Sequence, residues 1–192
     1  MRRSFGISKR VNQYSNKKGF TIIETMVAAT IILILSAILL PNYKAFNAQF
    51  SLLRSAHKLA QDIRRAQEMA TSARELQGIT PPVPPGYGIY LTTEQAQDKN
   101  KKYILYADTN PAGGDECYTS GQGEEVEIID LESGVYIRTV PSSSVSINFI
   151  GPSPTTTISS GGGSVTITLS LESDVLKTKD VIVNSAGLIY VE

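Results

Sequence analysis

The stretch KKGFTIIETMVAATIILILSAILLP, residues 17–41, contains a run of 21 mostly apolar residues, from Phe20 to Leu40. A helix rises about 1.5 Å per residue, so this run is long enough to cross a hydrocarbon core roughly 30 Å thick. Residues 1–19 hold six Lys and Arg residues and no acid. Because basic residues stay on the cytoplasmic side, we expect a single-pass membrane helix with a cytoplasmic N-terminus and an exported C-terminal part.

Glu24 is the residue that an ordinary membrane anchor does not explain, because a carboxylate in lipid costs a few kcal/mol unless it is paired or near the interface. A cleaved secretory signal and a buried helix of a soluble protein are further alternatives. The apolar region of a secretory signal usually has roughly 7–15 residues and ends in small residues, so it fits this run poorly. The position of Glu24 calls for a counter-charge.

The sequence Gly19-Phe20-Thr21-Ile22-Ile23-Glu24 resembles the type IV prepilin signal, with its basic leader, glycine, aromatic residue and glutamate. The resemblance implies that a prepilin peptidase cuts between Gly19 and Phe20 and then methylates Phe20. It also implies that Glu24 pairs with the N-terminal amine of a neighbouring subunit during filament assembly, and in low dielectric such a cation keeps the carboxylate charged. Pro41 either marks a bend in the helix during assembly, as in many pilins, or ends the membrane helix at the interface.

The rest of the chain predicts one amphipathic helix followed by short strands. Apolar residues recur every three or four positions from Leu52 to Ala73, and the helix is expected to end near Gly78. Residues 151–163 are interpreted as a flexible loop. Eight β-rich runs bounded by turn residues are expected to be strands: 87–92, 103–107, 126–131, 135–140, 145–150, 164–171, 181–184 and 188–191.

These elements predict an α+β fold in which one long N-terminal helix, half in the membrane and half amphipathic, packs on antiparallel β-sheets, as in the pilin-like fold. The expected parts are a leader removed by the peptidase (1–19), a transmembrane and assembly helix (20–41), an amphipathic stalk helix (42–78) and a β-rich head (79–192).

Three further stretches, 60–70, 145–151 and 180–191, resemble the GspH/FimT branch of minor pilins and pseudopilins. The resemblance implies a subunit of a type IV pilus or a type II secretion pseudopilus. Its partners would be the prepilin peptidase, other pilin subunits and the lipid of the cytoplasmic (inner) membrane. Two alternatives remain open: a minor pilin for DNA uptake, and an anchored adhesion or ligand-binding head with no filament role.

One acidic loop in the head is a candidate calcium site. Asp108, Asn110, Asp115 and Glu116 offer oxygen ligands around a glycine turn, like the start of a D-x-N-x-x-G calcium loop. Thr119 occupies the twelfth position, where an EF-hand has an acid, so this is no EF-hand. The alternative is an Asx-rich β-turn with a solvated acidic rim. Beyond this ion, no cofactor is expected.

The composition argues against an enzyme and against nucleic acid as a partner. His57 is the only histidine and Cys117 the only cysteine, so a two-histidine metal site and an intrachain disulfide are excluded. From residue 80 onward the chain has 6 Lys and Arg against 14 Asp and Glu, and this charge does not favour phosphate binding. Residues 140–192 contain only Lys177 and Lys179 as basic residues, which weakens the DNA-uptake alternative.

Overall fold

The computed structural model describes residues 19–76, 82–109, 115–152 and 155–192, with residues 40–42 described as helical backbone only. It divides into two compact units, residues 1–42 and 43–192. A helix, α1, spans Ile22–Thr71. The other elements are β1 (Gly86–Thr92), the 3-10 helix η1 (Ala96–Lys101), β2 (Lys102–Asp108), β3 (Glu125–Asp130), β4 (Val135–Thr139), β5 (Ser144–Ile150), β6 (Thr155–Ile158), β7 (Ser164–Leu171), β8 (Thr178–Asn184) and β9 (Ile189–Val191).

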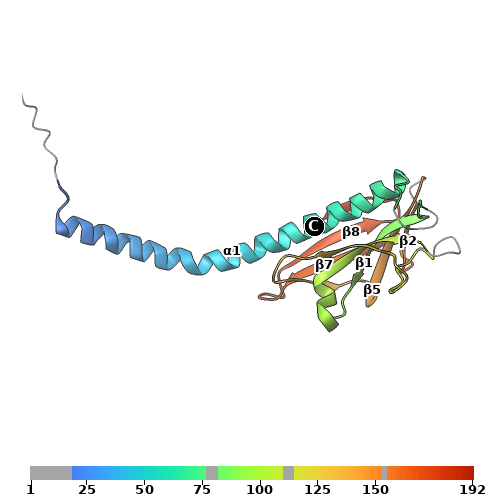
Figure 1. Ribbon diagram of the computed structural model, residues 1–192. Coiled ribbons are helices and arrows are strands. Elements are labelled where there is room, and N and C mark those ends of the chain that lie inside the picture. The colour runs from blue at the N-terminus through green and yellow to red at the C-terminus, as the bar shows by residue number, and fades with distance from the viewer. Residues whose placement is uncertain (1–18, 77–81, 110–114, 153–154) are drawn as a thin grey trace, which may run out of the picture. The chain divides into compact units, whose positions relative to one another are not determined.

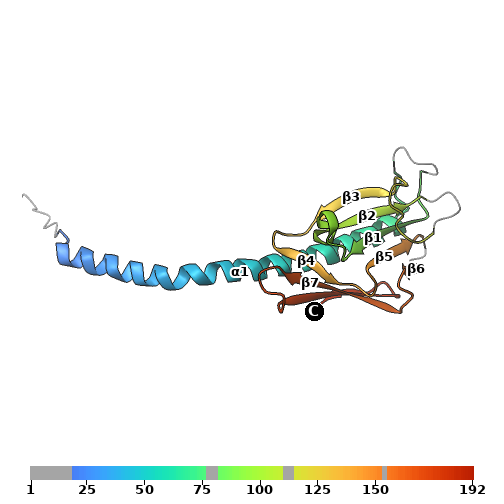
Figure 2. The same cartoon turned by 90° about the horizontal axis from the view of Figure 1, so that it is seen from below.

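The second unit contains two antiparallel sheets, which are visible in Figures 1 and 2. One sheet has the order β3-β2-β1-β5-β6 and the other the order β4-β7-β8-β9. The chain therefore alternates between the sheets, because β4 leaves the first sheet and β5 returns to it. The predicted α+β fold, with one long helix and antiparallel strands, is confirmed.

The second half of α1 packs against both sheets. Its apolar stripe is buried in a core shared with strands of each sheet. Polar residues beside the stripe bind the two sheets: Arg64 donates to the carbonyl of Ile189 in β9 at 2.8 Å. Asp62 accepts a hydrogen bond from the phenol of Tyr103 in β2 at 2.5 Å. The buried residues of the stripe are Leu52, Ala56, Leu59, Ala60, Ile63, Ala66, Met69 and Ala70.

The helix ends at Thr71, earlier than the predicted end near Gly78, which lies outside the described residues. Ala73 adopts a left-handed conformation with φ of 47°. The N–H of Ala73 bonds to the carbonyl of Ala70 at 3.2 Å, and that of Arg74 to the carbonyl of Met69 at 3.1 Å. These two bonds form a Schellman motif, which satisfies the last helical carbonyls. Alanine, rather than the expected glycine, therefore stops the helix, and Ala73 is not part of the apolar stripe.

Pro41 does not end the helix, since the helical backbone continues through residue 41 to Thr71. The helical backbone therefore does not end at Pro41, and the end of the membrane-spanning part at this residue stays a prediction. A proline lacks the N–H that would bond to the carbonyl four residues earlier, yet one missing bond does not stop a helix whose other residues favour it.

All eight predicted strands are present, and a ninth, β6, lies within residues 151–163, which were expected to form a flexible loop. Its sequence is Thr-Thr-Thr-Ile, four β-branched residues that suit an extended backbone. They pair with β5 in a register that joins Ile147 to Ile158 and Ile150 to Thr155. The abundance of Gly, Ser and Pro around this run concealed a short edge strand.

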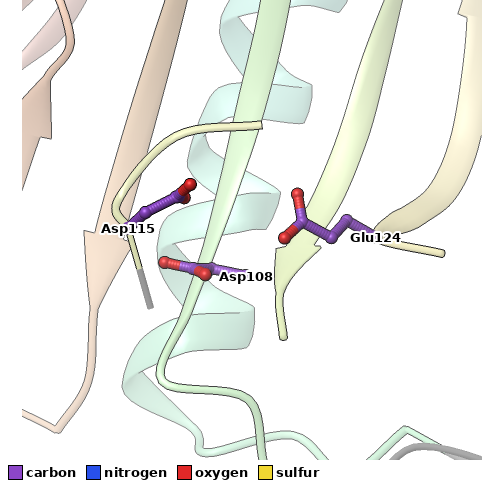
Figure 3. Close-up of side chains that lie close together, drawn as sticks. All are labelled: Asp108, Asp115 and Glu124. Atoms are coloured by element: carbon purple, nitrogen blue, oxygen red, sulfur yellow. The ribbon is translucent and has the colours of Figure 1, made fainter. Parts of the chain in front are cut away.

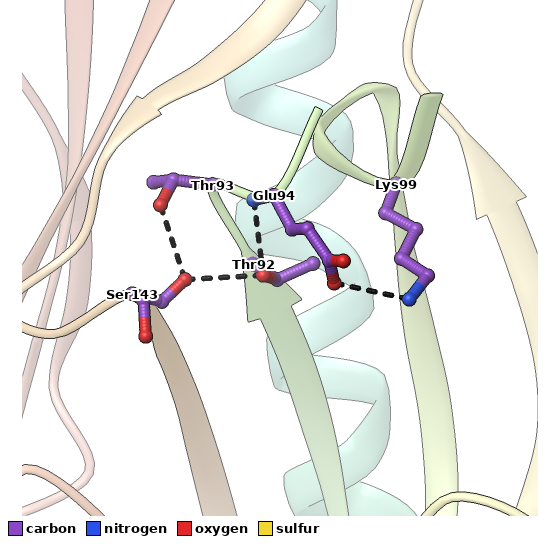
Figure 4. Close-up of polar contacts among 5 residues, drawn as sticks. All are labelled: Thr92, Thr93, Glu94, Lys99 and Ser143. Atoms are coloured by element: carbon purple, nitrogen blue, oxygen red, sulfur yellow. Dashed lines mark hydrogen bonds and ion pairs between the residues drawn. The ribbon is translucent and has the colours of Figure 1, made fainter. Parts of the chain in front are cut away.

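A polar network fixes the end of β1 against β5 and η1 (Figure 4). The hydroxyls of Thr92 and Thr93 both donate to the carbonyl of Ser143, at 3.0 and 3.1 Å. The N–H of Glu94 donates to the Thr92 hydroxyl at 3.1 Å, and the Glu94 carboxylate pairs with Lys99 of η1 at 3.0 Å. The network satisfies backbone groups where the strands end.

Candidate assembly segment and carboxylate cluster

The start of α1 is held by a side-chain cap. Thr21 directly precedes the first residue of α1, and its hydroxyl accepts a hydrogen bond from the N–H of Glu24 at 3.3 Å. Threonine followed three residues later by glutamate is the sequence of a capping box, and an acid in the first turn is favoured by the positive end of the helix dipole. Sequence reasoning missed Thr21, although the spacing to Glu24 was the signal. The backbone N–H of Glu24 is therefore satisfied by Thr21, and the Glu24 carboxylate lies in the first turn of α1.

The residues around the expected cleavage point are accessible. A side chain at Gly19 would meet nothing within 4 Å. Phe20 is 80% exposed, and Glu24 is exposed as well. Within the first unit the three residues therefore lie where another protein can reach them, while the side chain of Pro41 is outside the description.

The segment Ile22–Leu39 is long and apolar enough to cross a membrane, and none of its residues is buried. Large apolar side chains are exposed on all sides of it, among them Ile31, Ile32, Leu33, Ile34 and Leu35. A helix that is apolar all round needs an apolar environment, either lipid or other helices. The segment thus matches the expected membrane helix by length and composition.

In the head, three carboxylates come together at the connection between β2 and β3 (Figure 3). Asp108 ends β2, Asp115 lies in the connection, and Glu124 directly precedes β3. One oxygen from each lies within 4.8 Å of the other two. Asp108 and Glu124 are each only 1% exposed, whereas Asp115 is exposed.

The strand register and the backbone of the connection position these groups. The N–H of Ala107 donates to the carbonyl of Glu124 at 2.9 Å, which places Glu124 beside the end of β2. Asp108 Oδ2 accepts from the N–H of Glu116 at 3.0 Å and from Asn148 Nδ2 at 3.3 Å. Glu124 Oε2 accepts from the N–H of Thr119 at 2.7 Å. The cluster therefore joins β2, β3 and β5.

Burial raises the pKa of Glu124, and the neighbouring carboxylates of Asp108 and Asp115 raise it further, while the hydrogen bond from Thr119 opposes these effects. Three acids so close together repel one another when all are ionised. Repulsion of this kind is reduced when one acid retains a proton or when a cation binds.

The cluster differs in membership from the set predicted from the loop sequence. Asp108 and Asp115 lie together as expected, but Glu124 is the third member. Glu116 contributes its backbone N–H, and its carboxylate is not part of the group. Asn110 lies outside the described residues. The predicted set followed a pattern local in sequence, whereas pairing of β2 with β3 brings Glu124 back beside Asp108.

Comparison with known proteins gives one family match and two structural likenesses. Residues 14–40 match the prokaryotic N-terminal methylation motif. Two crystal structures of the type IV minor pilin FimU from Pseudomonas aeruginosa (strain PAO1) are similar, each at 16% sequence identity. The structure in space group P21 gives a TM-score of 0.47 and covers 77% of this chain and 92% of FimU. The structure in space group P65 gives a TM-score of 0.45 and covers 73% and 92%.

No curated protein matches the chain. The likeness to FimU is too distant to carry an argument of its own, so the family match stands on the N-terminal segment. That match includes Gly19, Phe20 and Glu24 together with almost all of the apolar run. The match to the prokaryotic N-terminal methylation motif therefore covers residues 14–40 and includes the whole of the expected processing point.

Proposed function

We propose that this chain is a prepilin-like subunit, a minor pilin or pseudopilin, that is anchored in the cytoplasmic membrane and assembles into a type IV pilus or a type II secretion pseudopilus. The observation that carries the proposal is the N-terminal methylation motif over residues 14–40, in register with a helix that is apolar and exposed on all sides. A removable basic leader followed by such a helix suits a subunit that first sits in lipid and then packs against other helices.

The proposed mechanism is assembly by exchange of apolar environments. Cleavage between Gly19 and Phe20 leaves an ammonium group on Phe20, which the peptidase methylates. On leaving the membrane, the segment Ile22–Leu39 exchanges lipid for the helices of neighbouring subunits, so its apolar surface stays out of water. The carboxylate of Glu24 and the amine of a neighbouring subunit then neutralise each other in low dielectric.

Two features of the rest of the chain support a structural rather than a catalytic role. His57 is exposed on α1, and Cys117 is half-buried in the connection before β3. Burial raises the pKa of the Cys117 thiol, as do the acids around it, and this disfavours the nucleophilic thiolate. We therefore propose that the head contributes binding surface and not chemistry.

The first test is the intact mass and N-terminal sequence of the protein purified from native membranes. The proposal expects a chain that begins at Phe20 and carries one methyl group. Cells that lack the prepilin peptidase are the control and should retain the full leader. A chain that still carries residues 1–19 in cells with an active peptidase contradicts the proposal and leaves an ordinary anchored domain.

The second test separates the charge of Glu24 from its place in the helix cap. Glutamine can replace glutamate in a capping box, so Glu24→Gln retains the cap and removes the charge. We expect both Glu24→Gln and Glu24→Ala to reach the membrane but not to enter filaments, as measured by shearing and immunoblotting. Thr21→Val, which removes the cap and leaves the charge, is the matched control and should still assemble. If Glu24→Gln assembles normally, charge pairing is not the mechanism.

A further inference from the structure

The hairpin formed by β2 and β3 is unusually poor in positive charge. Between Tyr103 and Ile137 the sequence contains eight acids and no Lys or Arg. Neutralising cations for the cluster of Asp108, Asp115 and Glu124 are therefore absent from the hairpin sequence itself. Asp108 and Glu124 are buried, and buried carboxylates are costly unless they are paired or coordinate a metal ion.

A second observation, independent of the number of acids, concerns the carboxylate of Glu124. Its Oε2 accepts a hydrogen bond from Thr119, and the backbone of Thr109 also stabilises the carboxylate, but Oε1 is buried and has no hydrogen bond of normal geometry among the described residues. Figure 3 shows this carboxylate pointing toward Asp108 and Asp115. A buried acceptor without a donor is destabilising, and more so when it is charged, so a cation bound at this oxygen would offset that cost.

We propose that Asp108, Asp115 and Glu124 bind one calcium ion. Calcium takes oxygen ligands at about 2.3–2.6 Å, so two ligand atoms on opposite sides of the ion lie about 4.6–5.2 Å apart. The spread of at most 4.8 Å among the three oxygens is compatible with one shared ion. Carboxylates are hard ligands, and with no thiolate or imidazole in the group, calcium or magnesium is favoured over zinc. Magnesium demands a tighter octahedron with ligands at about 2.0–2.1 Å and usually keeps several of its waters. We therefore expect it to fit this site less well than calcium.

The ion would connect three parts of the head. Asp108 ends β2, Glu124 precedes β3, and Asp115 belongs to the segment that joins the two strands. Asn148 of β5 acts as a positioning residue, since its Nδ2 donates to the Oδ2 of Asp108 at 3.3 Å. Binding would thus fix the β2–β3 connection to the sheet. This inference does not depend on the filament role, because it concerns the head alone.

The test uses the full chain in detergent micelles, first stripped with EDTA. Calcium is titrated while thermal unfolding is followed by circular dichroism, and terbium is titrated while its luminescence is excited through tyrosine. Tyr106 and Tyr118 are suitable donors, because Tyr118 lies in the connection that carries Asp115 and the phenol of Tyr106 donates to the carbonyl of Glu116 in it at 3.5 Å. We expect calcium to raise the melting temperature, magnesium at equal concentration to raise it less, and calcium to displace terbium.

Variants identify the ligands. Glu124→Gln should lower the apparent calcium affinity at least tenfold. Asp115→Asn should have the same effect, and because Asp115 is exposed, this variant still tests the proposal if Glu124→Gln does not fold. Glu116→Gln is the matched control: it removes an acid of the same connection outside the group, and its affinity should stay within twofold of the parent.

Three results would overturn the proposal. The first is a melting temperature that does not respond to calcium, together with no sensitised terbium luminescence. The second is parental affinity in both Glu124→Gln and Asp115→Asn. The third is an equal loss in Glu116→Gln, which would indicate diffuse attraction to acidic surface.

Discussion

Replacing Gly151 with alanine tests the contact that closes α1 onto the first sheet. Gly151 directly follows β5, and a Cβ at this position would lie 2.0 Å from the carbonyl oxygen of Ala70 and 2.9 Å from its carbonyl carbon. Both obstructing atoms belong to the backbone of the last helical turns. No rotamer change relieves the clash, so either α1 or the segment after β5 must move by more than 1 Å.

The size of the effect follows from that geometry. Inserting a methyl group into a packed region typically costs about 1–3 kcal/mol. We expect the upper end, about 3 kcal/mol, because Met69 and Ala70 on the same turn are buried in the core and would lose contacts as the helix shifts. For a domain of roughly 150 residues, each kcal/mol lowers the melting temperature by about 2–4 °C, which gives a decrease of about 6–12 °C.

Thermal and urea unfolding of the full chain in detergent measure this loss, with far-ultraviolet circular dichroism as the signal. Gly163→Ala is the matched control, because a Cβ there meets nothing within 4 Å and the backbone is not left-handed. If Gly151→Ala unfolds within about 0.5 kcal/mol of Gly163→Ala, the range of an ordinary surface substitution, then the close approach of α1 to the sheet does not stabilise the head.

Three other substitutions have defined outcomes. Ala73→Gly should raise the free energy of unfolding by about 1 kcal/mol, because glycine adopts the left-handed conformation without the cost that Ala73 bears; a decrease in urea midpoint would contradict this. Asp62→Asn should lower it by about 1 kcal/mol, because the amide oxygen still accepts from the phenol of Tyr103 but no longer carries a charge. Combining Asp62→Asn with Tyr103→Phe should cost less than the sum of the two single changes. Burial and the hydrogen bond to Glu125 raise the pKa of Tyr118 to about 12, so between about pH 10 and 12 the folded state keeps a proton that the unfolded state loses. Stability should therefore fall as the pH rises through this range, and Tyr118→Phe should weaken that fall in a pH series of melting temperatures.

Strand positions could be predicted because the sequence repeats with the period of an extended chain. In β7, for example, Val165, Ile167 and Leu169 are buried, and Thr166 between the first two is exposed. This alternation is a local property that needs no knowledge of the partner strand. The amphipathic half of α1 was visible for the same reason, because its period of three to four residues is equally local.

What the sequence concealed depends on contacts between distant residues or on backbone conformation. The end of α1 was missed because a left-handed Ala73 carries no sequence signal, whereas Gly78 does. The third acid of the cluster was missed because Glu124 reaches Asp108 only through the β2–β3 pairing, in which Ala107 bonds to Glu124. A loop motif read in sequence order gives Glu116 instead.

The outer edge of the first sheet has a consequence for how densely these heads can gather. β3 has no further strand beside it among the described residues, so its free backbone groups could pair with a second copy. Three of its six residues, Glu125, Glu127 and Asp130, are exposed acids, and of the three only Glu127 has an ion pair in the described structure, with Arg65. Two such edges would bring like charges face to face, which is destabilising across paired strands. The acids of β3 therefore disfavour edge-to-edge pairing of two heads through this strand.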